Sequence, residues 1–503
     1  MRFTKWAPNR GALAVAGLAV AALAMPGVPA VSAAKVPGPV LKLEAAQRSV
    51  TLYGFRGRVY LDPGIWVSAL ASPLELDVQR ASYTKPVTIT QIIHPPYGGI
   101  VRRPLPASIL DGFNGLRRFT VMTVRNLAGK VVLTRRASFC PNSSDPARVS
   151  PGGPPTQPYP AECTFNFIEV EPFQLGMVWG VQNGWAVDPV QNTGPVVKLP
   201  LGVYHLTEAI SPEYVRLFHI PAKDATATVK VTVAKQPKCC PPPGCCAAGR
   251  RHSARAPAAP PLPANAPILR HPPQSALPDL VPLPSWGIFV EHPRRQTHDY
   301  LVFAATVWIG GNGPLDVEGF RSNGSPTMKA YQYFWRNGHV IGRVRAGTMG
   351  FDSQKGHNHW HFEQFARYAL LNSAKSLTVR SQKVGFCIAP SDPVNLLLPH
   401  AVWQPPSLGF GPGNCGSPTA LWVAEQLPLG WGDTYFQFLA GQSFDITHVP
   451  NGTYYIEIVA NPEKVLYETS TRNDVSLRKV ILGGTPGHRT VKVPAWHGID
   501  PEP

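Results

Sequence analysis

Short runs of alternating or wholly apolar residues, separated by turn-forming residues, recur along most of this chain. Runs such as TATVKVTV (226–233) and GTYYIEIVA (452–460) are rich in β-branched and aromatic residues, which favour extended strands. Clusters of Gly, Pro, Asn and Asp bound these runs and predict turns between them. The pattern therefore predicts short strands joined by turns, and an all-β protein.

The second half of the chain repeats the pattern of the first. Four residues of the first half recur 250 positions later without a gap, in the pairs Gly202 and Gly452, Tyr204 and Tyr454, Pro212 and Pro462, and Asp224 and Asp474. Further upstream, Phe139-Cys140 corresponds to Phe386-Cys387, and Pro73-Leu74 corresponds to Pro314-Leu315. A register sustained over this length predicts a duplicated domain.

Two β-sandwich-like domains are the simplest architecture for such a repeat, at residues 40–235 and 277–481, with a C-terminal tail at 482–503. Between them, residues 236–276 are rich in Pro and Ala, which is typical of an extended spacer without a core. The spacer opens with CCPPPGCC, whose cysteines are Cys239, Cys240, Cys245 and Cys246. Disulfides, within the spacer or to another chain, and a soft-metal site both fit this cluster.

The first 33 residues have the pattern of a secretory signal peptide. A basic region with Arg2, Lys5 and Arg10 precedes an apolar run, and the small residues Val31-Ser32-Ala33 end it. The apolar run is short for a membrane span, and no later stretch of the sequence is long enough to cross a bilayer. We therefore expect a secreted protein with no stable membrane insertion, whose eight cysteines meet an oxidising environment.

Composition supports the all-β prediction and narrows the class of partner. Charged residues make up only 15% of the chain, while it has 56 Pro and 45 Gly, which disfavours long helices. The net charge of +17 falls to +14 once the three basic residues of the signal are removed. Without a recognition helix or a dense basic cluster we expect no binding to nucleic acid, and a basic surface instead favours anionic cell-surface polymers.

The stretch GHNHWHFEQF carries His357, His359 and His361. On a strand, residues at positions i, i+2 and i+4 point to the same side, so this spacing presents three imidazoles on one face. Trp360 and Phe362 point the other way and suit a core. Three imidazoles suit Cu(II), Zn(II), Fe(II) or Ni(II), and they leave coordination positions open for water, oxygen or a substrate.

The surroundings of the triplet resemble lysyl oxidases over about two hundred residues. The segments GHNHWHFEQFARYALL, KVGFC, GWGDTYFQF and FDITHVPNGTYYIEIVANPEKVLYETSTRNDV follow one another in the order found in that family. The resemblance implies that His357, His359 and His361 are copper ligands. It also implies that Lys383 and Tyr435 become cross-linked into a lysine tyrosylquinone cofactor.

The chemistry implied by this resemblance is the oxidation of primary amines. Copper and dioxygen oxidise the phenol to a quinone, which a neutral lysine amine attacks, and the resulting carbonyl cofactor condenses with the substrate amine. The substrate, either peptidyl lysine or a small amine, becomes an aldehyde, with release of hydrogen peroxide and ammonia. The function implied is that of a secreted copper-dependent amine oxidase.

Some residues depart from the family pattern. Arg367 stands where vertebrate members have a His, and Trp431 stands where they have a Cys. A guanidinium stays protonated and cannot replace a His in proton transfer. Asp433 and Glu363 lie near the motif and are the candidates for the catalytic base.

Two other classes of protein fit the residues without the resemblance. One is a non-catalytic surface or wall-binding β protein with a structural metal, and the other is a different non-haem metal enzyme such as a dioxygenase. Neither requires Lys383 and Tyr435 together, so this pair favours the amine oxidase.

The repeat also predicts how the cysteines pair and where the chemistry is absent. Cys140 should pair with Cys163, and Cys387 with Cys415, because the two pairs occupy corresponding places. In the same register Lys383 falls on Arg136, Tyr435 falls on Trp185, and the histidines fall near residues 110–115, where no His occurs. We therefore expect no amine oxidation by the first half.

Overall fold

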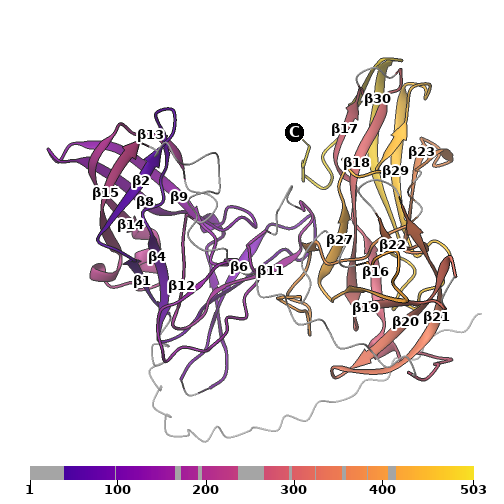
Figure 1. The fold of residues 1–503 in the computed structure, drawn as a ribbon, viewed down its shortest axis with the longest axis horizontal. Helices are drawn as coiled ribbons and strands as arrows, with labels where there is room; N and C mark the ends of the chain where they lie inside the picture. Colours follow the sequence, from indigo (N-terminus) through magenta and orange to yellow (C-terminus); the bar gives the residue numbers. More distant parts are fainter. Residues whose placement is uncertain are drawn as a thin grey trace, which may run out of the picture. The chain divides into compact units, whose positions relative to one another are not determined.

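The computed structural model describes residues 39–96, 98–164, 171–190, 195–235, 266–293, 297–322, 325–353, 358–381, 383, 385–405 and 415–502. Strands dominate these residues, and the one α-helix among them, α1 (Pro212–Leu217), is six residues long. The all-β prediction is confirmed (Figure 1). No helix of the described chain is long and apolar enough to cross a membrane.

The described residues of the first half form three main sheets and a two-stranded ribbon. The first sheet has the order β1 (Val40–Ala45), β4 (Ile65–Leu70), β12 (Trp185–Val187), β10 (Ala147–Arg148), and the second has the order β11 (Gly176–Val181), β5 (Leu74–Gln79), β6 (Thr88–Ile93), β7 (Val101–Leu105). The third sheet has the order β2 (Ser49–Gly54), β15 (Thr226–Lys235), β14 (Gly202–Ile210), β8 (Leu116–Asn126), β9 (Val131–Phe139), and the ribbon pairs β3 (Arg58–Tyr60) with β13 (Val196–Lys198).

In the second half, the residues that the structure describes also form three sheets. One has the order β16 (Pro278–Pro282), β18 (Tyr300–Gly311), β27 (Trp431–Tyr435), β25 (Asp392–Pro393), with β17 (Trp286–Glu291) and β28 (Ser443–Asp445) also paired to β18. Another has the order β22 (His359–Phe362), β21 (His339–Asp352), β20 (Thr327–Arg336), β19 (Leu315–Phe320), β26 (Trp422–Leu427). The last has the order β24 (Leu377–Arg380), β23 (Ala366–Asn372), β29 (Gly452–Ala460), β30 (Val475–Thr485), β31 (His488–Lys492).

The strand order of the two halves agrees sheet by sheet. The order β1-β4-β12-β10 recurs as β16-β18-β27-β25, and β11-β5-β6-β7 recurs as β26-β19-β20-β21. In the third sheet β9-β8-β14-β15 recurs as β24-β23-β29-β30. This agreement supports the duplication inferred from the sequence, which stays an interpretation.

The matched Gly and Tyr residues of the repeat have the same local structure in both halves. The hydroxyl of Tyr204 donates to the Pro200 carbonyl at 2.9 Å, and the hydroxyl of Tyr454 donates to the Pro450 carbonyl at 2.8 Å. Both rings are buried, so each bond satisfies a hydroxyl at the edge of a core. These bonds stabilise the scaffold at the same place in both halves.

Two predicted boundaries differ from the observed strands. The predicted end of the second domain at residue 481 falls inside β30, and β31 adds a further strand to the same sheet. In the spacer, residues 236–265 and all four of its cysteines lie outside the described residues. Residues 266–276 belong to the second half, because the Leu269 amide donates to the Arg343 carbonyl at 2.9 Å.

Candidate functional site

The histidine-bearing strand β22 lies at the edge of its sheet and pairs with β21. The side chains of Trp360 and Phe362 are fully buried in the core, as the alternation along the strand predicts. His359 and His361 point to the opposite side, where His361 is buried and His359 is half-buried. Their Nε2 atoms are 2.9 Å apart. His357 lies outside the described residues.

A glycine allows a second segment to pass close to His361. A Cβ atom at Gly385 would lie 2.7 Å from the Cβ of His361, closer than two such carbons can approach. Next to this contact, Phe362 and Phe386 exchange two backbone hydrogen bonds, of 2.8 and 3.0 Å. The segment around Gly385 is therefore held against β22, and it carries Lys383 and Cys387 to the same region.

Lys383 lies over the ring of Tyr435. Its Nζ is 4.2 Å from the centroid of the Tyr435 ring and 5.4 Å from that of Phe386. Gly441, whose φ is +83°, packs against the backbone of Lys383. Both Lys383 and Tyr435 are buried. The structure thus brings together the two residues that the resemblance assigns to the quinone cofactor.

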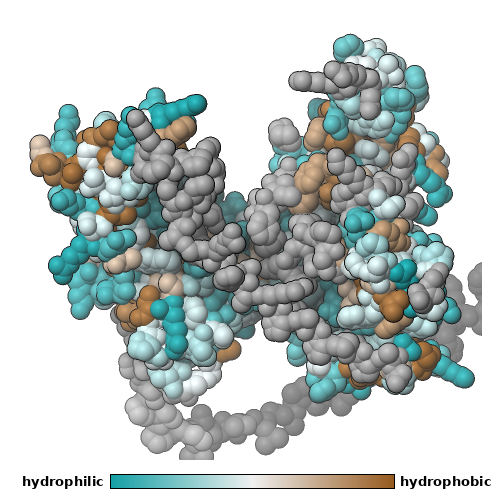
Figure 2. All heavy atoms as spheres, viewed as in Figure 1, coloured by the Kyte–Doolittle hydropathy of each residue, from teal (hydrophilic) through white to brown (hydrophobic). Residues whose placement is uncertain are grey.

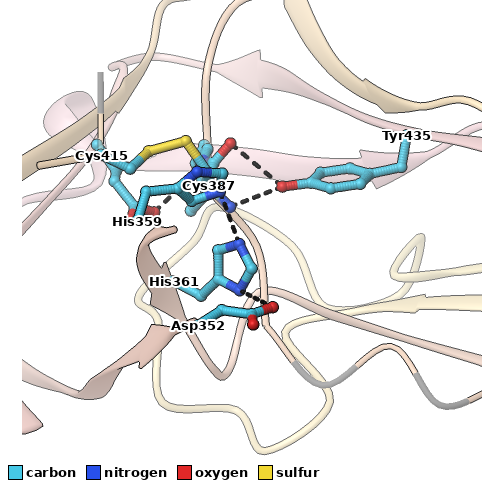
Figure 3. Close-up of a disulfide and its surroundings, with 8 residues drawn as sticks. Asp352, His359, His361, Cys387, Cys415 and Tyr435 are labelled. Atoms are coloured by element: carbon cyan, nitrogen blue, oxygen red, sulfur yellow. Dashed lines mark hydrogen bonds and ion pairs between the residues drawn. A yellow bond between two sulfur atoms is a disulfide. The ribbon is translucent and has the colours of Figure 1, made fainter. Parts of the chain in front are cut away.

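The Tyr435 hydroxyl is held by the backbone N–H and C=O of one residue, Cys387, in the neighbouring segment. The Cys387 amide donates to this hydroxyl at 2.6 Å, and the hydroxyl donates to the Cys387 carbonyl at 3.3 Å. Phe386 packs edge-on against the ring, with centroids 5.1 Å apart. Figure 3 shows the phenol directed at Cys387, and the imidazole of His361 between His359 and Asp352. The position of the ring is therefore fixed at both its face and its hydroxyl.

The disulfide between Cys387 and Cys415 joins this segment to β22. The two Cα atoms are 5.8 Å apart, and the Trp360 amide donates to the Cys415 carbonyl at 2.9 Å. In the first half, Cys140 and Cys163 form the matching bridge, with Cα atoms 5.7 Å apart. Both predicted pairings are confirmed, and they fit an extracellular protein.

Burial changes the ionisation of the Lys383 amine. Burial lowers the pKa of Lys383 from 10.5 to about 8, while the carboxylates of Asp433 and Asp352 act in the opposite direction. At pH 7 about a tenth of such an amine is neutral, against fewer than about one in a thousand for an exposed lysine. Because only the neutral amine is a nucleophile, this environment favours reaction at Lys383.

The acidic groups around the pair are also perturbed. Burial raises the pKa of Asp433 well above 3.8, and the nearby Lys383 opposes this effect. Burial is the main cause that raises the pKa of Tyr435 well above 10, and the negative charge of Asp433 is the second. The phenol is therefore neutral at ordinary pH. Asp433 lies two residues before Tyr435 on β27 and so points to the same face of the strand.

A cavity of about 650 Å³ lies beside His361 and Lys383. Three carboxylates line it, those of Asp352, Glu363 and Glu463, together with the guanidinium groups of Arg367 and Arg380. Glu363 and Arg367 are exposed at this cavity. Sequence reasoning identified both of these but missed Asp352, whose Oδ2 lies 3.7 Å from Nδ1 of His361. No motif singled Asp352 out, because it is on β21 and reaches the site through strand pairing.

The two described histidines have a spacing that suits a metal ion. Two nitrogen ligands at about 2.0 Å from one ion and at a right angle lie roughly 2.8 Å apart, close to the 2.9 Å between the two Nε2 atoms. Among the described residues, no group of three or more His, Cys, Asp or Glu side chains is arranged to hold a metal ion. The predicted set needs His357, which is not among them.

The first half has the same scaffold at this position but different residues. In the first half Leu116 pairs with Phe139, and in the second half Phe362 pairs with Phe386 in the same way. Counting back from Leu116 and Phe362, residues 111–115 correspond to the histidine stretch 357–361. None of residues 111–115 is a His, as predicted.

The predicted match of Tyr435 with Trp185 is wrong. The Trp185 amide donates to the Gln182 carbonyl, and the Trp431 amide donates to the Pro428 carbonyl, so each bond spans three residues. Each indole also donates to a carbonyl, that of Pro154 or Val402. Trp185 therefore corresponds to Trp431, and Tyr435 corresponds to Pro189. Proline cannot form a quinone, so the first half still lacks this residue.

Comparisons with known proteins add no further assignment. No family model matches the chain, and no curated protein is significantly similar to it.

Proposed function

We propose that this chain is a secreted copper-dependent amine oxidase that resembles the lysyl oxidases, with its active centre in the second half. The observation that carries the proposal is the position of the Lys383 amine 4.2 Å from the centre of the Tyr435 ring. An internal lysine is rarely buried without a functional reason, because burial penalises its charge. Here the same burial keeps a reactive fraction of the amine neutral beside the ring it would attack.

His357, His359 and His361 would hold the copper ion. Bound copper supplies the redox chemistry with dioxygen that turns a phenol into a quinone. The chain contributes the geometry. The peptide of Cys387 holds the phenol, and Gly385 brings the lysine segment against the histidine strand.

The cavity beside Lys383 would admit the substrate. Its carboxylates, those of Asp352, Glu363 and Glu463, would pair with the ammonium group of a primary amine, although the guanidinium groups of Arg367 and Arg380 line the same cavity. Two carboxyl groups are candidates for the base that removes the α-proton: Asp433, which is buried beside Lys383, and Glu363, which lines the cavity. The overall reaction consumes the amine, dioxygen and water, and releases an aldehyde, ammonia and hydrogen peroxide.

The direct test is to look for the cross-link. Protein secreted in the presence of copper is digested, and the peptides are analysed by mass spectrometry. We expect one peptide pair in which Lys383 is covalently joined to Tyr435. Finding both residues in separate, unmodified peptides from copper-saturated protein would reject the quinone mechanism.

Formation of the cross-link should depend on pH in a defined direction. Because burial lowers the pKa of Lys383 to about 8, the neutral fraction rises about tenfold from pH 6 to pH 7 and levels off above about pH 8. Adding copper to copper-free protein should therefore give quinone absorbance at a rate that follows this curve. Copper occupancy must be measured at each pH, so that a change in metal loading is not taken for an effect of the amine. A flat rate at constant occupancy would contradict the role of the neutral amine.

A further inference from the structure

An exposed face of the first half combines apolar side chains with cations. β2 continues into a two-residue turn at Arg56 and Gly57, where Phe55 and Arg58 exchange backbone hydrogen bonds of 2.8 and 3.0 Å. β3 follows and pairs with β13, so three chain segments lie next to one another here (Figure 1). We call the outward side of these segments the hairpin face; its residues are Tyr53, Phe55, Arg56, Arg58, Tyr60, Val196 and Lys198.

The strand register sets the arrangement of this face. Phe55 lies opposite Arg58, and Arg58 lies opposite Lys198 in the next strand. One pair further along β3, Tyr60 lies opposite Val196. Side chains of directly opposed residues point to the same side of a sheet. One row across this surface therefore consists of Phe55, Arg58 and Lys198. The adjacent row consists of Tyr60 and Val196.

The apolar members are much more exposed than large apolar residues usually are. Tyr53 is 55% exposed, Phe55 is 62% exposed, and Val196 is 61% exposed. The residues between them on the strands, Val59 and Val197, are buried in the core, so the face is held rigidly from beneath. Contiguous exposed apolar residues of this kind mark interaction sites. In Figure 2, brown and teal residues adjoin on this part of the molecule, at the upper left.

We propose that the hairpin face binds the surface of a membrane rich in anionic lipids. Arg56, Arg58 and Lys198 would lie against the lipid phosphates, and the rings and Val196 would enter the headgroup region. The Tyr53 ring suits this boundary, where one end is apolar and the other is wet, while the Tyr60 hydroxyl donates to the Val190 carbonyl at 3.0 Å and leaves the ring face outward. The binding is peripheral and does not depend on the proposed oxidase activity.

The test uses the full-length protein and two kinds of vesicle, phosphatidylcholine alone and phosphatidylcholine mixed with phosphatidylglycerol. We expect sedimentation only with the mixed vesicles, and weakening as salt is raised. Arg58→Gln should weaken binding about fivefold, and Phe55→Ser about tenfold.

Matched variants at other exposed positions serve as controls. Phe438 is 57% exposed and Val475 is 53% exposed, so Phe438→Ser and Val475→Ser should leave vesicle binding unchanged, whereas Val196→Ser should weaken it. Equal loss in the controls would overturn the proposal, as would equal binding to both vesicles.

Two other results would assign the face to a different partner and also overturn the proposal. One is binding of a soluble anionic polysaccharide that Arg58→Gln weakens, with no binding to mixed vesicles. The other is a dimer in analytical ultracentrifugation that Val196→Ser dissociates. The vesicle, polysaccharide and ultracentrifugation assays report on binding and not on the cofactor. A failed membrane test would therefore leave the cross-link test of the oxidase unaffected.

Discussion

Replacing Lys383 by alanine is expected to abolish amine oxidation while leaving copper bound. The variant lacks the amine that lies over the Tyr435 ring, so the cross-linked cofactor cannot form. Tyr435→Phe should have the same effect, because a phenyl ring has no hydroxyl from which a quinone can form. In each case peroxide release in the presence of a primary amine should fall by a factor of about 10⁴ or more.

Control variants separate this effect from a general loss of structure. Lys375→Ala and Tyr467→Phe change the same residue types at exposed positions and should retain wild-type rates. Copper content and thermal unfolding are measured for all four proteins. Wild-type turnover in both Lys383→Ala and Tyr435→Phe would show that the mechanism is wrong. The same assays also report on the first half, since turnover there would survive both changes.

Loss of the histidines is expected to remove the copper itself. Purified protein should bind about one copper ion per chain, and His359→Ala should lose most of it. His361→Ala should do the same, because its Nε2 converges with that of His359 at 2.9 Å. His298→Ala is a suitable control, since His298 pairs with Asp445 in an exposed ion pair.

The measurement is metal analysis after dialysis against a weak chelator. Unfolding of the copper-free proteins checks that the variants are folded, which matters because His361 is buried. Full copper occupancy in a variant with all three histidines replaced would show that the copper site does not lie on this strand.

Local patterns predicted the fold class, the alternation along β22 and the two disulfides. The alternation of β22 was readable because Trp360 and Phe362 are large and apolar while the histidines between them are polar. The disulfide pairs followed from the repeat, because each pair spans the same part of the scaffold. In both cases the information lies in a few neighbouring residues or in one repeated register.

Features that depend on strand pairing could not be predicted. Asp352 approaches His361 only because β21 pairs with β22. The stacking of Lys383 on Tyr435 depends on Gly385, whose role appears only when its distance to His361 is known. The mistaken match of Trp185 with Tyr435 has a related cause. A single offset ignores the loops, and loops between matching strands differ in length.

The bonds between Tyr435 and Cys387 have a consequence for the order of maturation. The peptide that orients the phenol belongs to a residue whose sulfur is tied to Cys415. In a compartment that keeps thiols reduced, this tie would be absent, and the segment that supports the phenol would be held to β22 by its backbone bonds alone. Cofactor assembly would then follow export, so that the oxidising chemistry starts only outside the cell that makes the protein. Protein trapped in a reducing compartment and supplied with copper would carry Lys383 and Tyr435 as separate residues; a cross-link found there would contradict this order.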